Sequence, residues 1–346
     1  MKKITISEIA KEARVSKSTV SLALRDSDRV TKKTKEKIFR IIKKYNYHPN
    51  SIAQQLASGK TGIIAIVTTR FAGTFVTPLL SSIENYVYQE KKFADIKIQM
   101  YSTFNIKKSK QEILNKILFS HLADAVIVVT IRPEKNIVDQ YEKSGVPLIL
   151  IENEFKNAHS VTIDNEIGVK KAMDYLLNKN KKDVIFVVGT QEPVKGEDFN
   201  ISARERLIAF KNWHNENKIK LKEENIYYSQ TYSFLEGKEI AEKILKRKKL
   251  PDAIFCAAGD VMAAGIIQKL AENKIKIPDE IAIIGYDNQL ISQTTTPALT
   301  TVDQKLEEVG KIAFLMVTDA LKNKIHNFLS CKNFIFKIRN TFYKTL

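Results

Sequence analysis

The chain has 346 residues, 44% of them hydrophobic and 27% charged, which is enough for two or three globular domains. Its 56 Lys and Arg exceed its 39 Asp and Glu, giving a formal charge of +17. Two cysteines exclude a disulfide framework, and neither they nor the five histidines have metal-ligand spacing. Because the N-terminus lacks an apolar signal segment and no apolar run approaches about 20 residues, we expect a soluble cytoplasmic protein without a membrane span.

The positive charge is concentrated at the N-terminus. Residues 1–60 hold 15 Lys and Arg against five acids, a balance of +10 that leaves +7 for the other 286 residues. A basic segment attached to a nearly balanced body is typical of proteins that bind nucleic-acid phosphates. The alternative is a general Lys-rich composition, which the remainder of the chain also shows.

Three short helices are predicted in the first 46 residues. Their apolar faces are Ile9, Ala10 and Ala13; Val20, Leu22, Ala23 and Leu24; and Ile38, Ile41, Ile42 and Tyr45. The expected N-terminal caps are Ser7, then Ser16 or Lys17, then Thr31 or Thr34. The break before the second helix has no glycine, so a left-handed Arg14 there would cost about 1 kcal/mol. Two crossed helices with a small, polar, basic outer face predict a helix-turn-helix that enters a DNA major groove.

A marginal helix and an α/β region follow. The segment from Asn50 to Gly59 predicts about two helical turns, too short to be stable alone, so it is a linker or folds on binding. From Gly62 onward, apolar runs alternate with amphipathic stretches, which predicts two parallel sheets covered on both faces. The expected strands are 62–67, 125–130, 146–151, 184–189, 253–258 and 281–286, and the expected helices are 79–91, 111–119, 168–177, 203–215, 237–245 and 261–273. Residues 152–161 are expected to cross between the sheets, and 336–346 to form a closing strand.

Five segments resemble the lactose-repressor (LacI/GalR) family of bacterial transcription regulators over the whole chain. They are ITISEIAKEARVSKSTVS, YNYHPNSIAQQLASGKT, SARERLIAF, PDEIAIIGYDNQ and TTTPALTTVDQ. The resemblance implies a three-helix helix-turn-helix headpiece, a hinge helix, and an α/β core with two parallel-sheet subdomains of the periplasmic-binding-protein type. The expected bounds are 1–46 for the headpiece, 47–60 for the hinge and 61–346 for the core, with an N-subdomain at about 61–160 and 290–322 and a C-subdomain at about 161–289 and 323–346.

The same resemblance implies the DNA contacts. Base contacts fall on Lys17, Ser18 and Leu22; phosphate contacts on Thr5, Ser16, Thr19, Ser21 and Thr34; and hinge contacts on Asn50, Ala53, Gln54 and Leu56. Leu22 stands where most members carry arginine, so it either touches a thymine methyl or turns inward as core. Leu56 is expected to wedge into the minor groove, with packing on the core domain as the alternative.

Effector contacts are implied at Arg204 and Asp287, with Phe75 and Asp164 as weaker candidates. A guanidinium and a carboxylate suit a polyol, so the implied effector is a sugar or sugar derivative; salt bridges are the alternative role. Gly259 stands where many members have Asn, and AGTFVT (72–77) replaces the family's Asn-Pro-Phe-Phe loop, so the ligand itself stays open.

These features favour a homodimeric repressor that binds a palindromic operator and is released by a small molecule in the core. No GxSxG, P-loop, GxGxxG or HExxH pattern indicates an enzyme, and no metal or cofactor is expected. The alternatives are an activator, a co-repressor-dependent regulator or one controlled by a protein partner. A sugar-binding transport protein would share the core fold, but it would need a signal peptide and would lack the basic headpiece.

Overall fold

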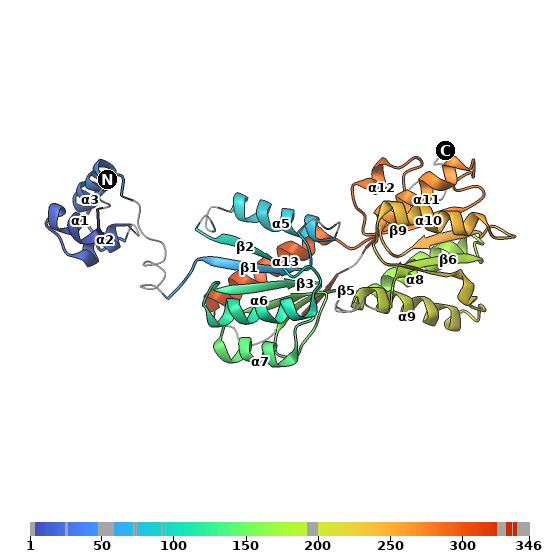
Figure 1. The fold of residues 1–346 in the computed structure, drawn as a ribbon, viewed down its shortest axis with the longest axis horizontal. Helices are drawn as coiled ribbons and strands as arrows, with labels where there is room; N and C mark the ends of the chain where they lie inside the picture. The colour runs from blue at the N-terminus through green and yellow to red at the C-terminus, as the bar shows by residue number, and fades with distance from the viewer. Residues whose placement is uncertain are drawn as a thin grey trace. The chain divides into compact units, whose positions relative to one another are not determined.

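The computed structural model describes residues 4–24, 27–47, 59–71, 73, 75–90, 93, 95–191, 200–323, 330–333 and 335–337. The chain forms two compact units, Met1–Thr61 and Gly62–Leu346, which we call the headpiece unit and the core unit (Figure 1). Among the described residues, no helix is long and apolar enough to cross a membrane.

The headpiece unit contains three helices, α1 (Ile6–Ala13), α2 (Lys17–Leu24) and α3 (Lys32–Lys44). Their shared core consists of Ile9, Ala10, Ala13, Val20, Ala23, Val30, Ile38 and Ile41, all buried. Tyr45, which the helical spacing placed on this apolar face, is 43% exposed. It is the C-cap of α3, so its direction no longer follows the helical period, and its ring lies 4.7 Å from Lys44 Nζ.

Local hydrogen bonds set the ends of these helices. The predicted cap Ser7 is wrong: Thr5 caps α1, because Thr5 Oγ1 accepts from Glu8 N while Thr5 N donates to Glu8 Oε2. Ser16 Oγ accepts from Thr19 N at the start of α2, and Thr31 Oγ1 accepts from Thr34 N at the start of α3, as predicted. Arg14 has the left-handed conformation that the break required, with φ of 53°.

The core unit contains two six-stranded sheets. The first has the order β11-β5-β4-β3-β1-β2, and all its pairings are parallel. Its strands are β1 (Ile63–Thr68), β2 (Lys97–Ser102), β3 (Ala125–Val129), β4 (Leu148–Ile151), β5 (His159–Ile163) and β11 (Ser330–Asn333). Helices α5 (Val76–Gln89) and α13 (Leu306–Asn323) cover one face, and α6 (Lys107–Phe119) and α7 (Lys135–Ser144) cover the other (Figure 1).

The second sheet has the order β12-β10-β9-β8-β6-β7 and is parallel except for the β10–β12 pair. Its strands are β6 (Val184–Gly189), β7 (Ile226–Ser229), β8 (Ala253–Cys256), β9 (Ala282–Tyr286), β10 (Thr300–Asp303) and β12 (Ile335–Lys337). Helices α8 (Asn165–Asn178) and α9 (Ile201–Glu216) cover one face, and α10 (Phe234–Leu245) and α11 (Asp260–Glu272) cover the other. The 3-10 turn η2 (Glu223–Asn225) and the short helix α12 (Ile291–Thr294) lie in the connections.

The strands correct three details of the predicted core. Residues 159–161 were expected in a polar crossover, but His159 and Ser160 are buried in β5, which pairs with β4. Residues 290–322 were expected in the first subdomain, whereas β10 pairs with β9 of the second sheet. Likewise β11 pairs with β5 of the first sheet, although 323–346 were expected in the second subdomain. The chain therefore crosses after β5, after β10 and between β11 and β12.

Candidate DNA interface and candidate ligand site

The N-terminal end of α2 carries an exposed polar group of side chains. Ser16, Lys17 and Ser18 are exposed, and Ser16 Oγ lies 2.6 Å from Ser18 Oγ and 2.8 Å from Thr19 Oγ1. Hydroxyls of this length reach phosphate oxygens without distorting the helix, and an ammonium beside them can reach guanine acceptors. The three predicted contacts therefore lie together on one accessible end of one helix.

The remaining predicted headpiece contacts differ in exposure. Thr5 is exposed but holds the Glu8 carboxylate, and Thr34 is partly exposed with Oγ1 2.9 Å from Thr31 Oγ1. Thr19 and Ser21 are partly exposed. Leu22 is partly buried and packs against the headpiece core, which supports the inward alternative more than the base-reading one.

Exposed positive charge is dense on the headpiece unit. The exposed cations of its described residues are Lys11, Arg14, Lys17, Arg29, Lys32, Lys33, Lys37, Arg40, Lys43, Lys44 and Lys60. Lys44 makes an ion pair with Glu12 at 2.9 Å, which ties α3 to α1. Such a density of exposed cations on a small unit is what phosphate binding requires. The predicted hinge contacts Asn50, Ala53, Gln54 and Leu56 lie outside the described residues.

In the core unit, Arg206 of α9 holds a buried polar network. Its Nε donates to Asn165 Oδ1 at 2.8 Å, Nη1 to Ala257 O at 2.9 Å and Nη2 to Gln304 Oε1 at 3.2 Å. Its guanidinium stacks 3.8 Å from the centre of the Tyr286 ring. Residues from α8, α9, β9 and the loop after β10 thus meet at one guanidinium.

Asp287 belongs to the same network. It follows β9 with φ of 106°, and its Oδ1 accepts from Gln304 Nε2 while Oδ2 accepts from Gln289 Nε2 at 3.0 Å. Gln304 therefore joins Arg206 to Asp287. Burial raises the pKa of Asp287 to about 6, although the positive charge of Arg206 acts in the opposite direction.

The Asp287 carboxylate lies close against the backbone of Gly259. A Cβ at Gly259 would lie 3.0 Å from Asp287 Oδ2, and its φ of 114° disfavours any other residue. The departure from the family's usual Asn therefore removes a side chain from directly beside Asp287.

The arginine predicted from the SARERL segment is not the one in the network. Arg204 is exposed, whereas Arg206 is 8% exposed. Side chains two positions apart on a helix point in directions about 200° apart, so only one of these two arginines can face the sheet. The buried positions Ala203, Leu207 and Phe210 recur at helical spacing and place residue 206 on their side. That spacing is the signal that identifies Arg206.

The two weaker candidates lie in different places. Phe75 precedes α5 and packs partly buried against the core of the first sheet. Asp164 caps α8, since its Oδ1 accepts from Ile167 N at 3.0 Å, and it also lines a pocket. The structure therefore does not bring Phe75, Asp164 and Asp287 into a single hydrogen-bonded group.

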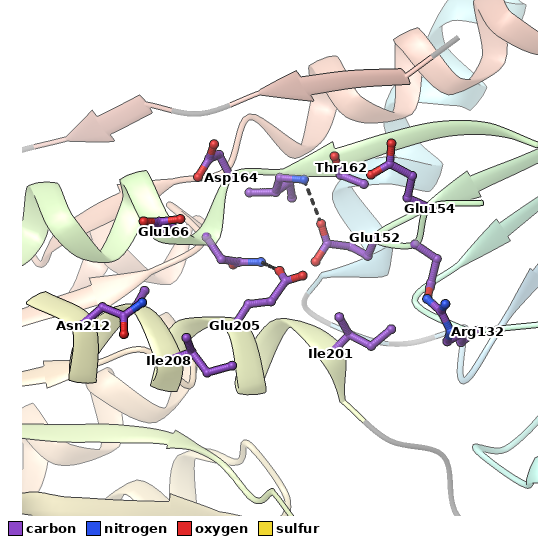
Figure 2. A pocket seen from close by; sticks show the side chains of 14 residues that line it. Arg132, Glu152, Glu154, Thr162, Asp164, Glu166, Ile201, Glu205, Ile208 and Asn212 are labelled. Atoms are coloured by element: carbon purple, nitrogen blue, oxygen red, sulfur yellow. Dashed lines mark hydrogen bonds between the residues drawn. The ribbon is translucent and has the colours of Figure 1, made fainter. Parts of the chain in front are cut away.

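The pocket that Asp164 lines has a volume of about 350 Å³ and an acidic wall. We call it the acidic pocket (Figure 2). Its lining residues are Arg132, Glu152, Asn153, Glu154, Thr162, Ile163, Asp164, Asn165, Glu166, Ile201, Glu205, Ile208, Ala209 and Asn212. They come from the ends of β3, β4 and β5, from the start of α8 and from the first three turns of α9. Sequence reasoning identified only Asp164, because the other members are separated along the chain.

Asn165 connects the acidic pocket to the Arg206 network. Its Nδ2 donates to Glu205 Oε2 at 2.7 Å, while its Oδ1 accepts from Arg206 Nε and from Tyr286 Oη at 3.3 Å. Glu152, also in the pocket, accepts from Ile163 N at 3.2 Å and from Ser202 Oγ. Burial raises the pKa of Glu152, although the Ser202 hydrogen bond and the positive charge of Arg206 lower it in part.

Comparisons with known proteins agree with this architecture. Residues 5–50 match the family described as bacterial regulatory proteins, lacI family, and residues 173–329 match the periplasmic binding protein-like domain. The HTH-type transcriptional repressor PurR of Vibrio parahaemolyticus is 26% identical over 325 residues, with 93% of each chain covered. Catabolite control protein A of Priestia megaterium is 28% identical over 318 residues, covering 91% of this chain and 92% of the relative.

Solved structures share the fold. The lac repressor dimer bound to operator and the anti-inducer ONPF superposes with a TM-score of 0.82 at 20% identity, covering 99% of each chain. The transcriptional regulator CelR in its cellobiose complex gives 0.68 at 19% identity, covering 98% of this chain and 100% of that one. The predicted fold, a helix-turn-helix headpiece followed by two subdomains of the periplasmic-binding-protein type, is confirmed.

Proposed function

The chain belongs to the lacI family of bacterial regulatory proteins, and we propose that it is a homodimeric transcriptional repressor controlled by a small molecule. Its headpiece binds a palindromic operator, and a ligand in the core unit lowers the affinity for that operator. The observation that carries the proposal is a basic headpiece, with an exposed polar end on α2, joined in one chain to a core with a buried Arg206–Gln304–Asp287 network.

Lys17 and Ser18 are the side chains that read bases in this proposal. Both are exposed at the end of α2, whereas Leu22 contributes mainly to the headpiece core. Thr5, Ser16, Thr19, Ser21 and Thr34 supply hydroxyls to phosphates, and the surrounding cations supply affinity that depends on salt. The operator half-site then differs at the base that an arginine at position 22 reads in other members.

The effector in this proposal is a small polyhydroxylated molecule at Asp287 and Arg206. A guanidinium and a carboxylate present donors and acceptors in fixed planes, which suits adjacent hydroxyls. Arg206 takes the place that the sequence prediction gave to Arg204, because it lies with Asp287 in one network. Gly259 lets the backbone approach the Asp287 carboxylate closely, because a Cβ at this position would lie only 3.0 Å from Asp287 Oδ2.

The two functions are coupled by linkage. If the ligand lowers the operator affinity by some factor, the operator lowers the ligand affinity by the same factor. A ligand that tightens DNA binding instead identifies a co-repressor. A ligand that binds one arrangement of the core more tightly than another can either lower or raise the affinity for DNA.

Selection of duplexes from a random pool with the full chain, followed by footprinting, tests the DNA half. We expect enrichment of a palindrome, and loss of that enrichment for Lys17→Ala; a pool that stays random contradicts the proposal.

Thermal-shift screening of mono- and disaccharides, nucleosides and sugar phosphates tests the ligand half. A ligand at 100 times its Kd adds about 2.7 kcal/mol to the stability of the core.

A further inference from the structure

The acidic pocket carries more negative charge than the chain around it. Five carboxylates line it, Glu152, Glu154, Asp164, Glu166 and Glu205, against the single guanidinium of Arg132. That guanidinium stacks 4.6 Å from the centre of the Phe155 ring. The chain as a whole has a net charge of +17, whereas the local charge of this pocket is negative. Such a field attracts cations and repels phosphates and carboxylates.

Two of these carboxylates have no counter-charge. Among the described residues, Glu154 and Glu166 make no hydrogen bond and no ion pair, and both are exposed. Glu152 and Glu205 point toward each other across the pocket (Figure 2). Burial raises the pKa of Glu152 and the Glu205 carboxylate acts in the same direction, while the Ser202 hydrogen bond and the charge of Arg206 oppose them. Facing carboxylates of this kind are stabilised by a positive charge between them.

A second observation is independent of charge. Asn153 lines the pocket and is 4% exposed; its Nδ2 donates to Ile131 O at 3.0 Å, which fixes the side-chain amide. Among the described residues, the other amide atom, Asn153 Oδ1, has no hydrogen-bond partner, and neither does the buried Oγ1 of Thr162, another lining residue. Buried acceptors are normally satisfied, so these two atoms call for a donor that the protein does not supply.

The dimensions of the pocket favour an organic cation over a metal ion. Within the described part of the chain, no three His, Cys, Asp or Glu residues are close enough to hold a metal. The carboxylates instead surround a volume of about 350 Å³, which lies in the range of small-molecule sites. An ammonium group carries a positive charge and several N–H donors, which complement the carboxylates and the unpartnered acceptors of the wall.

We propose that the acidic pocket binds a small organic molecule with at least one ammonium group. The ammonium lies beside the facing Glu152 and Glu205 carboxylates (Figure 2), and Glu154 and Glu166 add negative charge to the same pocket. Binding reaches the Arg206 network through Asn165, which holds Glu205 on one side and Arg206 on the other. Only an effect of this binding on operator affinity rests on the proposed function. The binding itself is independent of that function, because it is measured without DNA.

Calorimetric titration of the full chain at pH 7 tests the proposal with paired probes. The pairs are D-glucosamine with D-glucose, and putrescine with 1,4-butanediol, each differing chiefly in ammonium groups. We expect at least one ammonium probe to bind about tenfold or more tightly than its neutral partner. The proposal is overturned if no ammonium probe binds more tightly than its neutral partner. If a neutral sugar still binds in that case, the proposed function stands.

Variants locate the binding. Glu154→Gln combined with Glu166→Gln removes two exposed charges without disturbing a hydrogen bond between described residues, so the fold should persist. We expect the affinity for the ammonium probe to fall about tenfold. The matched control is Glu216→Gln, an exposed acid at the end of α9, whose loss should change affinity less than twofold. Equal losses in both variants would show general attraction to an acidic surface and overturn the proposal.

Discussion

The headpiece unit and the core unit present their functional groups in opposite ways. In the headpiece, Ser16, Lys17 and Ser18 are neighbours in sequence and are exposed on one helix. In the core, Arg206, Asp287 and Gln304 come from three separate elements and are held by hydrogen bonds to one another. The first arrangement depends on local helical geometry and the second on tertiary packing. Mutations should therefore separate the two functions cleanly.

The largest expected effect comes from Arg206→Ala. It leaves Ala257 O and Gln304 Oε1 without a donor, removes one of two donors to Asn165 Oδ1, and removes a positive charge beside Asp287. Breaking a buried charged network of this kind costs about 3–5 kcal/mol, so calorimetry should show a lower melting temperature for the core. The exposed Arg204→Ala is the matched control, with a change below about 0.5 kcal/mol. Similar losses in both variants would contradict the placement of Arg206.

Ile38→Ala should destabilise the headpiece unit and abolish its DNA binding. Ile38 is fully buried in the small headpiece core, and truncation of such a side chain costs about 2–5 kcal/mol. We expect loss of DNA binding in a gel-shift assay while the core transition in calorimetry stays unchanged. Phe39→Ala, at a neighbouring position that is 43% exposed, should retain DNA binding. A shifted core transition in Ile38→Ala would show that the units do not unfold independently.

Asp287 should make the stability of the core depend on pH. Its pKa is raised to about 6 in the folded core, above its ordinary value of 3.8, so the folded state takes up a proton that the unfolded chain does not. Stability therefore decreases as pH rises from about 4 to 6, by up to about 2–3 kcal/mol. Urea unfolding at pH 4.5 and pH 7 should show a smaller decrease in Asp287→Asn than in the parent. Equal decreases in stability in the variant and the parent would contradict the buried environment of Asp287.

Lys17→Ala should weaken binding to the selected operator by about 1–3 kcal/mol if Lys17 contacts a base. Binding to unrelated DNA should change less, and competition titration with both duplexes measures the difference. Lys248→Ala, which removes an exposed cation from the core unit, is the control. Equal losses on both duplexes would identify Lys17 as a phosphate contact only.

The smallest effect is expected for Leu22→Ala. Because Leu22 is only partly buried, its truncation should cost about 1 kcal/mol of headpiece stability and leave base preference unchanged. Thermal unfolding and repeated selection from a random pool measure the two quantities. A changed preference at one base, with unchanged stability, would restore Leu22 as a reading residue.

Local sequence predicted the three headpiece helices and many elements of the core unit, but not β2, β7, α7 or α13. The alternation of apolar runs with amphipathic stretches predicted β6 at its observed bounds, and most of the other predicted strands and helices within a few residues. It missed β5, because His159, Ser160 and Thr162 are polar and only pairing with β4 buries them. It also missed β10 in the second sheet, since strand partners are chosen by the path of the chain rather than by composition.

By itself, the sequence determined the helix-turn-helix, the left-handed turn at Arg14 and the exposed polar end of α2. These depend on contacts within a few residues, where spacing and capping chemistry decide the structure. The tertiary structure alone decided that Arg206 rather than Arg204 joins Asp287, and that five carboxylates share one pocket. Those groups lie up to about a hundred residues apart in the chain, and only the packing of helices on the two sheets brings them together.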